Sequence, residues 1–89
     1  MNNNYIIVHF QPFAMDSNIV LMKDGNKQSY YFSNDSFQLA NELIELAYAT
    51  NIYNIKLEMP IDFSIGFIEL LNNLEQNMYS TNKIDIEVI

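Results

Sequence analysis

Few residues of this chain have the chemistry of a catalytic or ligand-binding group, and they are scattered. His9 is the only histidine, and histidine is the side chain that most readily changes its charge near neutral pH. The carboxylates that could assist it, Asp16 and Glu58, stand apart from it in the sequence. A lone histidine inside an apolar segment is usually a hydrogen-bonded structural residue, because catalysis and metal binding need convergent partners. We therefore predict no catalytic residue.

Carboxylates could also bind a divalent cation. Glu42 and Glu45 stand three residues apart on an expected helix, and Glu58 and Asp62 flank the end of an expected strand. In an open α/β sheet, ligands bind beyond the carboxyl ends of the strands, and clustered carboxylates there can bind magnesium. However, Glu42 and Glu45 fall on the polar side of their helix, and Asp62 is well placed to cap the next one. We predict no metal site and no cofactor.

The composition excludes several kinds of site. The chain has 89 residues, of which 49% are hydrophobic, and it has no cysteine. Disulfides, thiolate nucleophiles and cysteine-ligated zinc are therefore excluded. A chain of this size has material for one hydrophobic core, so we expect a single domain over residues 1–89. No apolar run approaches the roughly 20 residues that span a bilayer, and we expect a soluble, cytoplasmic protein.

The charge is strongly negative. Eleven Asp and Glu residues oppose four lysines, the net charge is -7, and arginine is absent. Arginine is the usual reader of guanine and the usual clamp for phosphate, so we expect no direct binding of nucleic acid. The anionic inner surface of a membrane should repel the chain as well. A basic protein surface is the charged partner that this composition favours.

The segment around which we expect the chain to be organised is 52–59. Apolar and polar residues alternate in it, which is typical of a strand with one buried face and one exposed face. Helix-like sequence lies on both sides, so it should be the central strand of an α/β unit. Its apolar positions are Tyr53, Ile55, Leu57 and Met59, and its polar positions are Asn54, Lys56 and Glu58.

Three further strands are expected before it. Residues 5–10 are apolar in both alternating registers apart from His9, which indicates a strand covered on both faces. Residues 11–17 should form a loop. Residues 18–23 and 28–32 flank Asp24 and Gly25, and an Asp-Gly step between strand-like runs predicts a β-hairpin, because glycine readily adopts a positive φ.

Two helices and a last strand complete the pattern. Residues 33–36 favour helix capping, with Gln38 at capping-box spacing from Asp35. The first helix should run to about residue 50 and end at Asn51. The second should begin after Asp62 and run to about residue 79, and residues 83–89 alternate like a strand. The apolar face predicted for the first helix consists of Phe37, Ala40, Leu43, Ile44 and Ala47.

The expected order is β-β-β-α-β-α-β, on the boundary between the α/β and α+β classes. Two right-handed crossovers in the same direction would give a two-layer sandwich, a five-stranded mixed sheet with both helices on one face. This order resembles a minimal core of the ribonuclease H-like and actin-like superfolds, in which the second strand is antiparallel and the fourth lies beside the first. The resemblance implies the fold alone. His9 and Gln11 stand where such nucleases place an aspartate, and residues 11–17 lack the glycines of an actin-like phosphate loop.

The uncovered face of such a sheet should be apolar across the first three strands and polar beyond them. Exposed apolar patches of this kind usually mark binding surfaces. An alternative is that the N-terminal tail, or the loop 11–17 with Phe13 and Met15, covers the face. Adjacent Tyr30 and Tyr31 must point to opposite faces. The residues predicted to line a partner interface are Tyr5, Ile7, Val20, Met22, Tyr31, Lys56 and Glu58.

We therefore expect a small, acidic, non-catalytic protein-interaction module, an adaptor or an inhibitor, whose partner is another protein or a second copy in a homodimer. One alternative is a phage-type acidic inhibitor whose carboxylates mimic nucleic-acid phosphates. Another is a degenerate ribonuclease H-like, metal-dependent enzyme with carboxylates near Glu58. A third is a structural subunit that is stable only as an oligomer.

Overall fold

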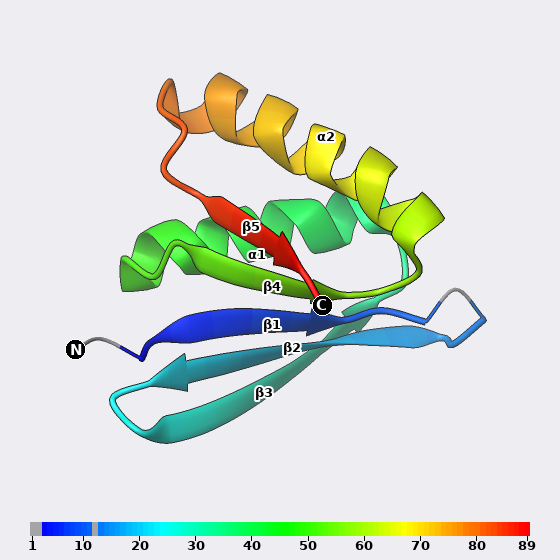
Figure 1. Cartoon of the computed structure of the whole chain (residues 1–89), viewed down its shortest axis with the longest axis horizontal. Coiled ribbons are helices and arrows are strands. Elements are labelled where there is room, and N and C mark those ends of the chain that lie inside the picture. Colours follow the sequence, from blue (N-terminus) through cyan, green and yellow to red (C-terminus); the bar gives the residue numbers. More distant parts are fainter. Residues whose placement is uncertain (1–2, 12) are drawn as a thin grey trace.

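The computed structural model describes residues 3–11 and 13–89, so Pro12 of the predicted loop lies outside the described part. Seven elements follow one another in the predicted order (Figure 1). The strands are β1 (Tyr5–His9), β2 (Asp16–Lys23), β3 (Asn26–Ser33), β4 (Asn54–Glu58) and β5 (Asp85–Val88), and the helices are α1 (Ser36–Thr50) and α2 (Ile61–Tyr79).

The five strands form one mixed sheet in the order β3-β2-β1-β4-β5. β2 runs antiparallel to β1 and β3, whereas β4 runs parallel to β1 and β5 runs parallel to β4. β1, β3, β4 and β5 consequently share one direction. The antiparallel second strand and the position of the fourth strand beside the first are both as predicted, and so is the two-layer arrangement.

Strict alternation along the strands separates the two faces of the sheet. Ile6 and Val8 of β1 are fully buried with Ile55 and Leu57 of β4 in a core that also contains apolar side chains of both helices. The intervening residues point to the opposite face, because successive side chains alternate across a strand. The helices therefore cover one face, and the other is the open face of the sheet.

The predicted hairpin is confirmed. Lys23 pairs with Asn26, which leaves Asp24 and Gly25 as a two-residue turn. Both have positive φ, 53° and 80°, which is the conformation of the tight turns that match the twist of a hairpin. β2 begins at Asp16, earlier than predicted, because its pairing with β3 extends to the Asp16–Ser33 pair.

The helix ends agree with the sequence in part. The Asp35 carboxylate accepts hydrogen bonds from the backbone N–H groups of Phe37 and Gln38, and Asn51 ends α1 with φ 58°, as predicted. Phe37 was placed on the buried face, which is wrong: it is 54% exposed. It lies in the first turn of α1.

The predicted cap of the second helix is also wrong. Pro60 occupies the N-cap position of α2 without a side-chain hydrogen bond, and Asp62 lies inside the first turn. A carboxylate there still interacts favourably with the positive end of the helix dipole. Within the described ranges, no helix is long and apolar enough to cross a membrane.

Candidate functional site

The sheet register brings the predicted interface residues to one face. Ile7 pairs with Val20 on one side and with Lys56 on the other, and Tyr5 pairs with Met22. Cross-strand partners point to the same side of a sheet. These five side chains therefore lie together on the open face.

The other two predicted residues lie in the next row toward the carboxyl ends of the parallel strands. Glu58 pairs with His9, His9 with Asn18, and Asn18 with Tyr31. This row runs across four strands, with Tyr31 at one end and Glu58 at the other. Both end residues are exposed, Tyr31 to 73%.

The apolar part of the open face is more enclosed than the sequence suggested. Val20 is only 6% exposed, and Tyr5, Ile7 and Met22 are half-buried by neighbouring side chains. The ammonium of Lys56 lies 4.5 Å from the centre of the Tyr5 ring, a distance typical of a cation–π contact. The loop 11–17 does not shield this face, since Phe13 and Met15 are almost fully exposed.

His9 has one of its two expected helpers. Its Nδ1 lies 2.7 Å from Glu58 Oε2, with both side chains partly exposed. Asp16 begins β2 opposite Ser33 and forms no ion pair with His9. Among the residues that the structure describes, no three histidine, aspartate or glutamate side chains are grouped so that they could hold a metal ion. The contact with Glu58 orients the imidazole of His9.

A second surface lies at the sheet edge where β1, β3, β4 and β5 have their carboxyl ends. Three connections meet there: the β1–β2 loop, the β3–α1 connection and the β4–α2 connection, all at the right of Figure 1. The β1–β2 loop and the beginnings of α1 and α2 carry large apolar side chains that are between 54% and 102% exposed. We call this group the apolar rim; it consists of Phe13, Met15, Phe37, Ile61 and Ile65.

Polar and aromatic contacts fix the connections that carry the rim. The Asn34 side-chain amide donates to the backbone oxygens of Gln11 and Ala14, at 3.0 and 2.9 Å. These bonds tie the β1–β2 loop to the start of α1. On the other side, the rings of Phe10 and Phe63 stack with their centroids 4.2 Å apart, which joins the end of β1 to the first turn of α2.

A hollow of about 270 Å³ separates the first turns of the two helices. Ser36 lines it from α1, and Asp62, Phe63 and Gly66 are among the residues that line it from α2. Because Gly66 has no side chain and nothing lies within 4 Å of a Cβ built there, this part of α2 leaves space open. The hollow lies between the beginnings of α1 and α2, and no rim side chain is among the residues that line it.

The charges near the rim have one sign. Residues 10–17, 33–38 and 58–66 contain four carboxylates and no lysine. Two of the four lysines, Lys23 and Lys27, lie at the β2–β3 hairpin, which is at the other end of the sheet, and Lys83 precedes β5 at that same end. The carboxylates of the rim region are Asp16, Asp35, Glu58 and Asp62.

One polar residue of the interior was missed from the sequence. Glu75 of α2 is 1% exposed. Its Oε2 accepts hydrogen bonds from the Tyr48 hydroxyl and from the backbone N–H groups of Lys83 and Ile84, the latter two at 2.9 and 3.1 Å. Its Oε1 is buried without a hydrogen-bond partner among the described residues. Glu75 thus joins α2 to α1 and to the start of β5.

The sequence does contain a signal that Glu75 is buried, namely its spacing from apolar residues of the same helix. Phe67, Leu71 and Glu75 follow one another at intervals of four, so Glu75 falls on the buried stripe of α2. Tyr48, its partner, also stacks on Tyr79 with ring centroids 3.7 Å apart. Burial, and then the hydrogen bond to Glu75, raise the pKa of the Tyr48 hydroxyl above its usual value of 10.0.

Comparison with protein-family models and with curated proteins finds no match to this sequence. The geometry is therefore the basis for a functional proposal. It offers one exposed His–Glu pair, one half-enclosed open face, and one exposed apolar rim with carboxylates around it.

Proposed function

We propose that this chain is a small, non-catalytic protein-interaction module, an adaptor or an inhibitor, that binds its partner through the apolar rim. The observation that supports this most is the exposure of the rim: five large apolar side chains, each more than half exposed, come from the β1–β2 loop and from the beginnings of α1 and α2, at one end of the sheet. Soluble proteins seldom group such side chains on their surface unless the group is a binding site.

The charges around the rim indicate the chemistry of the partner. Four carboxylates and no lysine lie in the segments that carry the rim. A partner surface with lysine or arginine around an apolar centre would complement it. In such an interface the apolar contacts supply most of the affinity, and the charges around them speed association and select the partner.

The predicted open-face residues extend this surface. Tyr31 and Glu58 are exposed and lie at the two ends of the four-strand row of the open face that is nearest the rim. A partner seated on the rim would reach Glu58 first, since it ends β4 immediately before the connection to α2. We propose the cytoplasm as the compartment, because the core forms without disulfides and needs no oxidising environment.

The test is affinity capture from the native host with the whole chain as bait, followed by a binding measurement with the purified partner. Ile61→Ser/Ile65→Ser removes two rim side chains that are 70% and 66% exposed. We expect this variant to keep the circular dichroism spectrum of the wild type and to bind the partner at least tenfold more weakly. Asn73→Ser, at an exposed position farther along α2, is the control and should bind as the wild type does.

Salt separates this proposal from mimicry of nucleic acid. Binding through the rim should weaken moderately as salt screens the surrounding carboxylates. A phosphate mimic should instead lose most of its affinity in high salt and be indifferent to Ile61→Ser/Ile65→Ser. Equal binding by the wild type and the rim variant, at every salt concentration, would contradict the role of the rim.

A further inference from the structure

The outer edge of β3 is the least protected strand edge of the sheet. β3 is terminal in the strand order, and its eight residues pair one-to-one with β2 without a bulge. It contains no proline, no glycine and no carboxylate. Within the described residues, its backbone groups bond to no strand other than β2. Soluble proteins usually shorten, bend or charge such an edge, because its free N–H and C=O groups can pair with another strand.

The opposite edge is built differently. β5 has four residues, and two of them are Asp85 and Glu87. A short strand with two carboxylates is a poor template for a further strand. β5 is therefore better protected than β3, which is longer and whose only charged side chain is Lys27.

We propose that two copies of this chain pair through β3, antiparallel and about a two-fold axis at Ser29, to form a continuous ten-stranded sheet. In this register Lys27 of each copy lies opposite Tyr31 of the other copy. Both side chains are exposed on the open face, and a lysine across from a tyrosine is a favourable cross-strand pair. β3 is also a place where two chains of charge -7 can approach without facing carboxylates.

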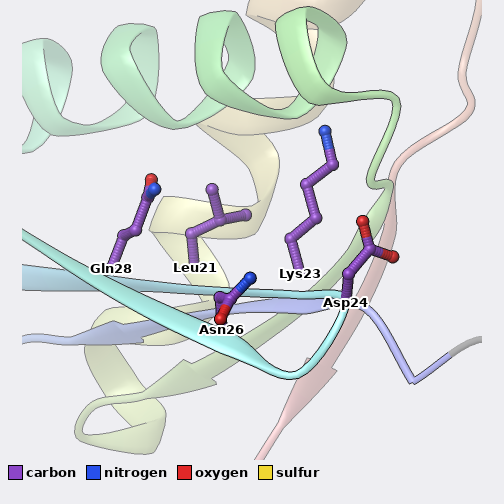
Figure 2. A pocket seen from close by; sticks show the side chains of 5 residues that line it. All are labelled: Leu21, Lys23, Asp24, Asn26 and Gln28. Atoms are coloured by element: carbon purple, nitrogen blue, oxygen red, sulfur yellow. The ribbon is translucent and has the colours of Figure 1, made fainter.

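Charge complementarity favours a second copy as the occupant of this edge. A hollow of about 460 Å³ lies beside the second half of β3 on the helix side, and Phe32, Glu42 and Glu45 are among its lining residues. An antiparallel partner places its hairpin end next to that half of β3. The hairpin end carries Lys23, whose side chain extends toward the helix side of the sheet (Figure 2).

These charges have no other partners in the described chain. The ion pair between His9 and Glu58 is the only one among residues 3–11 and 13–89. Lys23 and Asp24 line the same small hollow of about 100 Å³ but form no ion pair with each other, and Glu42 and Glu45 form no ion pair with a cation. The dimer would place the Lys23 of each copy near the acidic hollow of the other, so that the two contacts are equivalent.

The proposal is tested by exchanging charges. Lys23→Glu alone and Glu42→Lys/Glu45→Lys alone should each shift sedimentation from dimer toward monomer, with a dissociation constant at least tenfold higher than that of the wild type. An equimolar mixture should recover the dimer mass, because each contact then joins opposite charges again. Glu69→Lys/Glu87→Lys changes the net charge of the chain as much as Glu42→Lys/Glu45→Lys does, at exposed positions away from β3, and should dimerise at least as well as the wild type.

Cross-linking tests the register. The chain has no cysteine, so Ser29→Cys introduces a single thiol at the proposed axis, and it should form a covalent dimer with a short thiol-reactive cross-linker. Asn73→Cys on α2 should not. A wild type that sediments as a monomer at all concentrations, or a dimer that both charge variants retain, would overturn the proposal. Neither result bears on the rim, which these substitutions leave unchanged.

Discussion

Glu75 is a buried carboxylate, and three donors from two separate parts of the chain account for its position. Its Oε2 accepts from the Tyr48 hydroxyl in α1 and from two backbone N–H groups just before β5. Those N–H groups lie outside any regular ladder, so a side chain has to satisfy them. Glu75 holds the incoming β5 against the ends of both helices.

We expect Glu75→Ala to lower the free energy of unfolding by about 3 kcal/mol, because it leaves the backbone N–H groups of Lys83 and Ile84 without an acceptor and a void in the interior. Glu75→Gln keeps one acceptor oxygen and should cost less. Urea unfolding measures both. Glu69→Ala, at an exposed position of the same helix, is the control and should change stability by less than about 0.5 kcal/mol. If Glu75→Ala lowered the free energy of unfolding no more than the control does, Glu75 would not hold β5 against the helices.

The raised pKa of the Tyr48 hydroxyl predicts a loss of stability in alkali. The folded state holds this proton more tightly than the unfolded state, so the stabilisation is complete below about pH 10 and is lost as the pH rises through the folded-state pKa. Tyr48→Phe lacks the ionisable group. We expect the difference in unfolding free energy between wild type and Tyr48→Phe to shrink above about pH 10. If this difference in unfolding free energy stayed constant above about pH 10, the raised pKa of Tyr48 would be contradicted.

The two glycines of the chain occupy opposite kinds of element. Gly25 has φ 80° in the hairpin turn, whereas Gly66 lies inside α2. Nothing lies within 4 Å of a Cβ built at either position. Steric room is thus equal, and backbone conformation alone decides the effect of an added methyl group.

We expect Gly25→Ala to destabilise the protein by about 1 kcal/mol, because a residue with a Cβ is strained at positive φ. Gly66→Ala should stabilise it by about 0.5 to 1 kcal/mol, because alanine favours the helix more than glycine does. Thermal unfolding of the two variants should shift the midpoint in opposite directions. If both variants shifted the thermal midpoint in the same direction, backbone conformation would not be what decides the effect at these two positions.

The elements were largely readable from the sequence because their signals are local. The Asp24–Gly25 turn, the Asp35 cap and the alternation through β4 depend on neighbours within a few residues. Asp62 was misassigned because a capping carboxylate and a first-turn carboxylate look alike in sequence. The N-cap is Pro60, two residues before Asp62. Phe37 was misassigned because helical periodicity does not tell whether the first turn of a helix is covered by other parts of the chain.

The candidate site was less predictable, because it depends on what meets at one edge. The rim combines loop residues with the first turns of two helices, and no single stretch of sequence shows that grouping. The register did place all seven predicted interface residues on the open face. Their role in binding stays a prediction, as does that of the rim.

At the scale of the whole molecule, charge repulsion should exceed charge attraction. The net charge is -7, and the described residues contain a single ion pair, between His9 and Glu58. Sodium chloride should therefore stabilise the fold, because screening removes more repulsion than attraction.

We expect the thermal midpoint to rise between about 0.01 M and about 1 M salt, over which the screening length falls from about 30 Å to about 3 Å. Scanning calorimetry at one low protein concentration measures this without a contribution from association. Glu69→Lys/Glu87→Lys, which reduces the net charge, should show a smaller rise. A midpoint that falls with salt would mean that favourable charge contacts dominate.

The position of β1 between β2 and β4 also sets the order in which the molecule can form. The hairpin and α1 need only nearby residues, but Ile6 pairs with Ile55, which leaves the ribosome much later. Until then one edge of β1 has no partner, and the chain must close a long loop before the sheet is complete. Docking of β4 beside β1 should accordingly be the slow step of folding. A nascent chain that stops before β4 would expose Ile6 and Val8 and depend on chaperones until the strand arrives.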